Sequence, residues 1–396
     1  MFPDLEKAQE DIILLAGPSV HPDGMEDLPI SAFKPKTLKY GHHESKFFLL
    51  FYEKGVRFII HTANLIHQGL YNMAQGIWHQ VSHSCDLNLA RTCNTHELYK
   101  QCNSVSNVWR GKISNSNGAS CRGWGDTIIG DGNSNDVYID HQDFPQKTSG
   151  SPRSSEFEDD LRRYLDAIDF PKEIKRTDGS VARLDLSQAI RDFDFSHARA
   201  KLVTSVPGRH QQEDKLKFGQ MAVRVALGRE YFRSFDDAPP TSLALQFSSF
   251  PRLKKQYFDS IVESFSAGFR YPADPRIVWP TMKETKGSTG VEALIGDKKN
   301  IDIALGLQIP FYRFTTAHTS QEAAMPQIKT FVRYHVETGR IAWMVLASNN
   351  LSEGAWGVLE ADGFQLLIKS FEIGVLLLPS LELEYLSQPK ACQITI

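Results

Sequence analysis

The chain has 396 residues, of which 41% are hydrophobic and 23% charged, with a formal net charge of −3. This apolar content is enough for two ordinary globular domains or one large one. The lack of a basic excess excludes a protein that holds nucleic acid by its overall charge, so phosphate binding would need a local cluster of cations. Charged residues follow Met1, and no run approaches the roughly 18 apolar residues of a membrane span, so we expect an intracellular protein with no membrane partner.

The first part of the chain contains short strand-like runs. The apolar run Asp11–Ala16 predicts a buried strand. Residues 47–52 and 56–62 flank the turn Glu53–Gly55, which is typical of an antiparallel hairpin of buried strands. Residues 62–78 favour a loop and a helix.

Residues 79–150 are rich in Ser, Asn and Gly and show little periodicity, which predicts a long irregular insertion. The stretch contains candidate zinc ligands, namely Cys85, Cys93, Cys102, Cys121, His79, His83 and His96. Their spacing matches no C-x-x-C pattern, so we predict neither a metal site nor a cofactor.

Strands and helices alternate after the insertion. Ser155 is the expected N-cap of a helix, with Glu158 three residues later and apolar residues at helical spacing. These apolar residues are Phe157, Leu161, Tyr164, Leu165 and Ile168. Helical segments are predicted within 211–232 and 252–266, and strands over 200–205, 340–348, 365–369 and 374–379. This alternation favours an α/β fold with sheets covered on both faces.

Two stretches of the chain resemble each other, HHESKFFLLFYEKGVRFIIHTANLI and MPQIKTFVRYHVETGRIAWMVLASNNLS. Each has a lysine, a strand, a turn, a second strand, and an asparagine followed by leucine. Lys46 precedes Asn64 by 18 positions, and Lys329 precedes Asn350 by 21. This internal duplication predicts two similar domains related by a pseudo-twofold axis, with an active site at the seam between them.

Further motifs identify a family. The segments YGHHESKFF, AQGIW, SVPGRH, LQFSS, AMPQIKTF and LLIKSFEIGVLLLPS resemble the tyrosyl-DNA phosphodiesterase family of the phospholipase D superfamily. They occur in the family's order over residues 40–380, apart from the insertion. The resemblance implies two phospholipase D-like α-β-α domains, at 1–198 and 199–396, with the site at their interface.

The resemblance also implies a chemistry, the hydrolysis of 3′-phosphotyrosyl DNA in nuclear DNA repair. Each half of the family's site supplies a His-x-Lys and an Asn. The first His attacks phosphorus and forms a phosphohistidine, and the second protonates the tyrosine leaving group and then activates water. The Lys and Asn residues hold the phosphate oxygens. The partner implied is single-stranded or 3′-end DNA with a covalently linked peptide.

Carrying the motifs over by position shows that both histidines are replaced. The nucleophile position is Glu44 and the acid position is Gln327, whereas four cradle residues are retained, namely Lys46, Asn64, Lys329 and Asn350. The resemblance further implies supporting roles for Gln75 beside the nucleophile and Glu372 beside the acid. It implies substrate contacts for Ser249 and Ser352 and base stacking by Tyr40. As alternatives, these five residues are ordinary polar, capping or packing residues.

The substitutions predict weak or absent phosphodiesterase activity. Gln327 has no proton to donate as an acid, and Glu44 is expected to pair with the lysines and repel a phosphodiester. His43 could replace the nucleophile only through a bulge, because adjacent strand residues face opposite sides. Two alternatives stay open: a repurposed enzyme that uses Glu44 as acid or base on a different substrate, for example in specialised metabolism, and a non-catalytic protein that binds phosphate or DNA ends.

Overall fold

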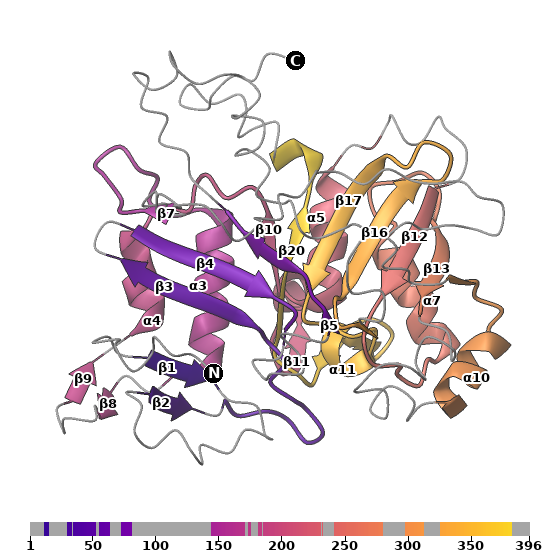
Figure 1. Ribbon diagram of the computed structural model, residues 1–396, viewed down its shortest axis with the longest axis horizontal. Coiled ribbons are helices and arrows are strands. Elements are labelled where there is room, and N and C mark those ends of the chain that lie inside the picture. Colours follow the sequence, from indigo (N-terminus) through magenta and orange to yellow (C-terminus); the bar gives the residue numbers. More distant parts are fainter. Residues whose placement is uncertain are drawn as a thin grey trace, which may run out of the picture.

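The computed structural model (Figure 1) describes most of the chain outside the insertion. The described residues are 12–15, 30–33, 35–52, 55–63, 73–80, 144–170, 173–175, 181–183, 185–230, 232, 241–279, 298–312 and 325–381. The predicted insertion lies outside them for residues 81–143.

A four-stranded sheet forms the N-terminal half. Its strands are β3 (Phe47–Tyr52), β4 (Gly55–His61), β6 (Ile77–His79) and β7 (Phe144–Pro145). β3 and β4 form the predicted antiparallel hairpin, and β6 and β7 both pair with β4. The expectation that β3 is buried is wrong, because it is the edge strand of this sheet and Phe48 and Leu50 are exposed.

The N-terminal half departs from prediction at two further places. The helix expected within 62–78 is wrong in the described part, since β5 (Met73–Ala74) and β6 are strands. The end of the predicted insertion is also ordered structure, because Phe144 of β7 is fully buried against β4. In both places a short strand pairs with an element distant in sequence, which local periodicity does not reveal.

Helix α3 (Glu156–Ile168) confirms the predicted capped helix. The Ser155 hydroxyl accepts a hydrogen bond from the Glu158 backbone N–H at 3.2 Å, and all five predicted apolar residues are buried. The remaining elements of this half are β1 (Ile12–Leu15), β2 (Ile30–Phe33), β8 (Glu173–Lys175), β9 (Val181–Arg183), α4 (Leu186–Ala189) and the 3-10 helix Ile190–Asp192. The strand predicted over Asp11–Ala16 is β1.

A seven-stranded sheet forms the C-terminal half. In spatial order it contains β10 (Lys201–Ser205), β20 (Glu372–Leu377), β17 (Ile341–Ala347), β16 (Thr330–His335), β12 (Thr241–Gln246), β13 (Asp274–Val278) and β14 (Phe311–Tyr312). A smaller sheet contains β11 (Gly208–Gln211), β19 (Gln365–Ile368) and β18 (Val358–Glu360). The predicted strands and helical segments of this half are confirmed. The domain boundary at 198/199 stays a prediction.

Both faces of the large sheet are covered, as the alternation of strands and helices predicted. The helices of this half are the 3-10 helix Gln212–Lys217, α5 (Gly219–Arg229), α7 (Lys255–Ser264), α10 (Lys298–Gly306) and α11 (Glu353–Trp356). Leu346 packs into one core with β4 and α3, whereas Val345 packs into a second core with α5 and α7. Neighbouring residues of one strand therefore join the sheet to the N-terminal half and to its own helices.

The two hairpins of the predicted duplication have the same construction. β3 and β16 each have 6 residues and begin directly after Lys46 and Lys329, and β4 and β17 each have 7. The first turn has two residues (53–54) and the second has five (336–340). The turns therefore account for the whole three-residue difference between the two Lys–Asn spacings.

The two halves exchange backbone pairings at their seam, near the centre of Figure 1. β5 of the N-terminal half pairs in parallel with β15 (Met325–Pro326) of the C-terminal half. In return, His43 forms a parallel bridge with Phe371, and the Glu44 N–H donates to the Phe371 carbonyl at 3.0 Å. Each motif is thus held by the opposite half of the chain.

Gly41 and Gly76 allow the close approach at this seam. A Cβ atom on Gly76 would lie 2.6 Å from Cδ1 of Leu346. A Cβ atom on Gly41 would lie 1.9 Å from the backbone oxygen of Lys369. A backbone atom cannot move aside as the end of a flexible side chain can.

We expect Gly41→Ala to destabilise the protein by about 1–3 kcal/mol, because the added methyl group forces the two backbones apart. Urea unfolding measures the change. Gly228→Ala is the matched control: Gly228 is an exposed residue of α5 with open space around its Cβ position. Alanine there is expected to be neutral or to stabilise by about 1 kcal/mol. Equal stability of the Gly41→Ala variant and the wild type would contradict the seam geometry.

Candidate active site at the seam

Glu44 and Lys46 form an ion pair in front of β3. The Lys46 ammonium donates to the Glu44 carboxylate at 3.2 Å and to the Glu44 backbone carbonyl at 2.9 Å. The Lys46 side chain is 11% exposed and the Glu44 side chain 43%. The predicted pairing of Glu44 with a lysine is therefore confirmed for Lys46. The Glu44 carboxylate offsets the positive charge of this lysine.

Lys329 occupies the equivalent place in front of β16 and is almost fully buried. Burial, reinforced by the charge of Lys46, lowers the pKa of Lys329, while Glu372 and Glu44 oppose the shift. Its ammonium donates to the Gln327 backbone carbonyl at 3.2 Å. One hydrogen bond leaves this three-hydrogen donor with capacity for a ligand.

Gln75 contacts Gln327, and this corrects one expectation. Its Nε2 donates to the Gln327 Oε1 at 2.5 Å, so Gln75 supports the acid position and not the nucleophile position. The reason is the parallel register of β5 and β15, which pairs Met73 with Met325 and Ala74 with Pro326. The next residue on each strand is then Gln75 opposite Gln327.

Glu372 correspondingly lies on the nucleophile side, because it follows Phe371, the residue bridged to His43. Its placement beside the acid position was therefore also wrong. Burial raises the pKa of Glu372, and the charge of Glu44 raises it further. A carboxylate at position 44 thus creates a like-charged pair at the seam, which favours the protonated form of the buried member.

Thr62 and Ser348 are site residues that the sequence reasoning missed. The Thr62 hydroxyl donates to the Gln75 Oε1 at 2.8 Å and accepts from the Gly76 N–H at 2.8 Å. The Ser348 hydroxyl likewise donates to the Glu372 carboxyl group and accepts from the Ile373 backbone N–H at 3.0 Å. Each hydroxyl lies two positions before the retained asparagine of its half, and this repeated spacing was the available signal.

Asn350 is held in a fixed orientation by the loop after β12. Its Oδ1 accepts from the backbone N–H groups of Ser248 and Ser249 at 3.1 Å each, and from the Ser248 hydroxyl at 3.3 Å. With the oxygen so engaged, the Nδ2 group is the part of this amide that can donate to a ligand. Asn64, the equivalent asparagine, lies outside the described residues.

The three predicted substrate contacts have different surroundings. Ser249 is exposed and donates to Asn350 through its backbone. The Ser352 hydroxyl caps α11 by accepting from the Ala355 N–H at 3.2 Å, which favours the capping alternative. Tyr40 is 75% exposed at a φ of 64°, with the Lys39 ammonium 5.0 Å from its ring centre. Its stacking role stays a prediction.

His43 packs against Phe371 across the seam. It is buried, and its ring centre lies 5.6 Å from that of Phe371. Among the described residues its Nε2 has no hydrogen-bond partner. The side chain that pairs with Lys46 is that of Glu44.

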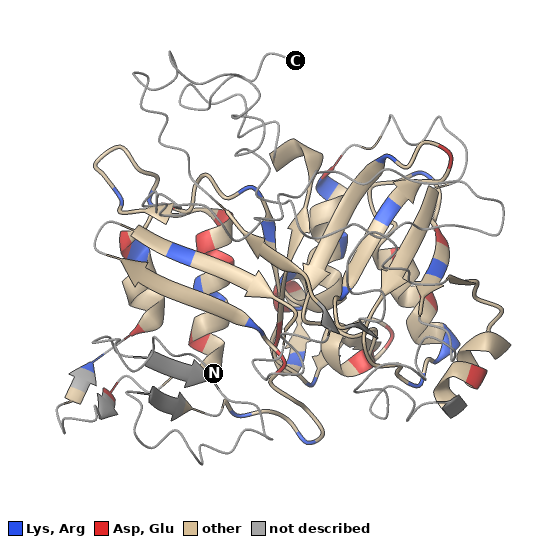
Figure 2. Cartoon of the chain, in the orientation of Figure 1, with Lys and Arg blue, Asp and Glu red and all other residues tan. Residues whose placement is uncertain are grey.

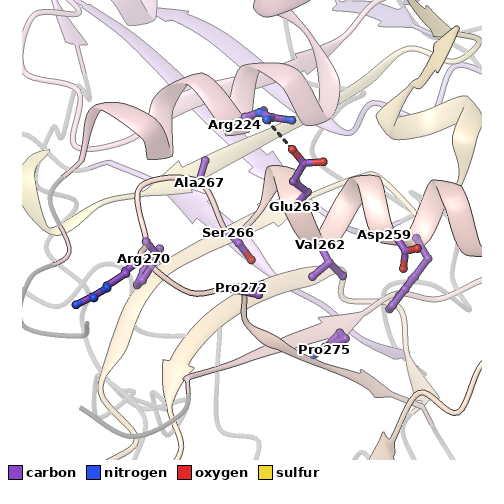
Figure 3. A pocket seen from close by; sticks show the side chains of 11 residues that line it. Arg224, Asp259, Val262, Glu263, Ser266, Ala267, Arg270, Pro272 and Pro275 are labelled. Atoms are coloured by element: carbon purple, nitrogen blue, oxygen red, sulfur yellow. Dashed lines mark hydrogen bonds and ion pairs between the residues drawn. The ribbon is translucent and has the colours of Figure 1, made fainter. Parts of the chain in front are cut away.

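The cavity in Figure 3 is separate from these residues. It has a volume of about 630 Å³ and lies between α5, α7 and the loop that leads to β13. Arg224 and Glu263 form an ion pair of 2.7 Å on its wall. No predicted site residue lines it.

Among the described residues, neither the distribution of charged side chains nor a cluster of metal ligands indicates a second site. In Figure 2, Lys and Arg are interspersed with Asp and Glu over the described elements of both halves. The described residues contain no cluster of candidate metal ligands. The four cysteines of the insertion lie outside them. None of the described helices combines the length and the apolar character of a membrane span.

Comparison with known proteins identifies the family. The sequence model of the tyrosyl-DNA phosphodiesterase family matches residues 8–100 and 129–393. This chain belongs to that family. The unmatched residues 101–128 fall inside the predicted insertion.

Similar proteins agree with this assignment. Tyrosyl-DNA phosphodiesterase 1 of Arabidopsis thaliana is 30% identical over 361 residues, which cover 88% of this chain and 48% of the relative. The chain thus spans about half the length of this relative. A probable tyrosyl-DNA phosphodiesterase of Schizosaccharomyces pombe is 24% identical over 403 residues, covering 90% and 66%. A crystal structure described as yeast tyrosyl-DNA phosphodiesterase matches with a TM-score of 0.51 at 14% identity, covering 88% of this chain and 69% of that chain. This match confirms the phospholipase D-type α/β fold.

We expect His43→Phe to reduce the acid sensitivity of the fold. Burial lowers the pKa of His43 to about 4 from its ordinary 6.5, so the unfolded chain binds a proton that the folded chain does not. Stability present above pH 6.5 is therefore lost as the pH falls toward 4, by about 2 kcal/mol between pH 7.5 and 5.

Urea unfolding at both pH values measures this difference. The His43→Phe variant should lose less stability on acidification than the wild type. His42→Phe, at the exposed neighbouring position, controls for the loss of an imidazole from this segment. An unchanged pH dependence in the His43→Phe variant would show that the buried imidazole titrates normally.

Proposed function

We propose that this chain is a tyrosyl-DNA phosphodiesterase-like protein that binds a phosphodiester at the seam and hydrolyses it weakly or not at all. The observation that carries the proposal is the ion pair between Glu44, at the nucleophile position, and Lys46. The pair places a negative charge where the family's nucleophile would meet phosphorus. It also occupies a cation that would otherwise stabilise the transferring phosphoryl group.

The acid position supports the same conclusion. Gln327 is a neutral amide hydrogen-bonded to Gln75, and an amide does not release a proton to a tyrosine leaving group. Loss of a general acid alone typically lowers a rate by about 10²–10⁴. Loss of the histidine nucleophile is expected to cost at least as much, so the two substitutions together are expected to leave little hydrolysis.

The retained cradle supports binding. The retained Lys329 and Asn350, and the substituted Gln327, each have donor hydrogens without a partner among the described residues. Glu44 offsets one of the two lysine charges, and Glu372, whose pKa is raised by burial, adds a second negative charge only when it ionises. This balance matches a monoanionic phosphodiester better than a dianionic phosphate monoester. DNA with a 3′-linked peptide is the proposed ligand, and the nucleus the proposed compartment.

One observation favours the repurposed enzyme as a second candidate. The Glu44 side chain is 43% exposed, so a substrate can reach its carboxylate. Carboxylates act as acids, bases or nucleophiles in other enzymes. Binding of a phosphorylated DNA end without cleavage would favour the non-catalytic protein, whereas neither binding nor cleavage by a folded chain would favour a different substrate.

The purified protein is expected to show little or no cleavage of a 3′-phosphotyrosyl oligonucleotide, measured by release of the tyrosyl group. Lys46→Ala serves as the control for site-dependent activity. Robust cleavage that Lys46→Ala abolishes would refute the proposed loss of activity.

Glu44→His combined with Gln327→His is expected to raise cleavage by at least the factor of about 10²–10⁴ that a general acid supplies. Each single variant should remain slow, because it lacks either the nucleophile or the acid. If the double variant binds the oligonucleotide but stays inactive, the rest of the site is not intact.

A further inference from the structure

A chain of hydrogen bonds crosses the seam and ends on Gln327. The Gly76 N–H donates to the Thr62 hydroxyl at 2.8 Å, and the Thr62 hydroxyl donates to the Gln75 Oε1 at 2.8 Å. The Gln75 Nε2 then donates to the Gln327 Oε1 at 2.5 Å. Backbone, hydroxyl and two amides are thus connected in one direction.

The hydrogen-bond distances favour that direction. A backbone N–H can only donate, so the Thr62 oxygen accepts at this end and has one proton to give. The Gln75 Oε1 is its nearer acceptor at 2.8 Å, against 3.4 Å for the Gly76 carbonyl. Since the Gln75 oxygen faces Thr62, its NH₂ group faces Gln327.

Gln327 must then accept through its oxygen, which leaves its NH₂ group for another partner. No described residue accepts a hydrogen bond from this group, although the residue as a whole is only 8% exposed. The Lys329 ammonium, two positions along the same segment, also has hydrogens without an acceptor among the described residues. A neutral donor and a cation are therefore presented together.

In the other half of the site a hydroxyl also donates to a supporting side chain, but that side chain is a carboxyl group and not an amide. The Ser348 hydroxyl donates to Glu372, which is a second acidic group on the side of Glu44. The side of position 44 therefore carries two acidic groups, whereas the side of position 327 carries an amide donor. An oxyanion would therefore be held mainly from the Gln327 side.

We propose that Thr62 is a positioning residue whose hydroxyl, acting through Gln75, turns the NH₂ group of Gln327 toward a bound tetrahedral oxyanion. The former acid position thereby becomes an anion-binding position. The ligand class is a monoanionic phosphodiester, for which inorganic phosphate serves as a probe. This inference rests on the proposed phosphate binding at the seam.

The test compares the inorganic phosphate affinity of the full chain and its variants by titration calorimetry at pH 6, where the probe is largely monoanionic. Thr62→Val keeps the shape and removes the hydroxyl, so affinity is expected to fall about five- to tenfold, the value of one hydrogen bond. Thr62→Ser restores the hydroxyl and should recover most of the affinity. Gln75→Met interrupts the same chain elsewhere and should act like Thr62→Val, which keeps the test available if one variant does not fold.

A double-mutant cycle separates positioning from general damage. Gln327→Met removes the proposed donor, and adding Thr62→Val to it should weaken phosphate binding by less than twofold more. Additive losses would overturn the inference, since they would mean that Thr62 acts without Gln327. Unchanged affinity in both Thr62→Val and Gln75→Met would also overturn it while leaving the proposed function standing. Absence of phosphate binding by the wild type would overturn both.

Discussion

The reciprocal backbone pairing at the seam is the constraint on which the candidate site depends. β5 runs beside β15, and the segment that contains Glu44 runs beside the segment that contains Glu372. Each half therefore positions the substituted histidine position of the other half. Neither half alone contains a complete site. Gly41 lets its backbone approach that of Lys369, and Gly76 leaves room for the side chain of Leu346.

The same constraint gives the two substitutions different consequences. Gln327 meets a neutral amide, Gln75, and the two form a hydrogen bond. Glu44 lies on the side of a buried carboxyl group, Glu372, and pairs instead with Lys46. Where the family resemblance implies a nucleophilic histidine on one side and an acidic histidine on the other, this chain has a charged cluster and an amide pair.

Much of this arrangement could be predicted because it depends on residue patterns that are local in the sequence. The repeated Lys–strand–turn–strand–Asn pattern located both hairpins, and fixed spacing from Lys46 and Lys329 located the substituted positions. The supporting residues were assigned to the wrong sides, because sequence order says nothing about which half a strand pairs with. The hydroxyls of Thr62 and Ser348 were missed because their partners lie 13 and 24 positions along the chain, beyond the reach of local patterns.

The sequence by itself determined the family and the α/β class and predicted which residues stand at the two histidine positions, since these depend on residue type and spacing along one chain. Only the tertiary structure decided that Gln75 meets Gln327, that Glu372 lies on the side of Glu44 and that His43 is buried against Phe371. The physical reason is that these contacts follow from the register of strands that pair across the seam, and a shift of one residue in that register would exchange every partner.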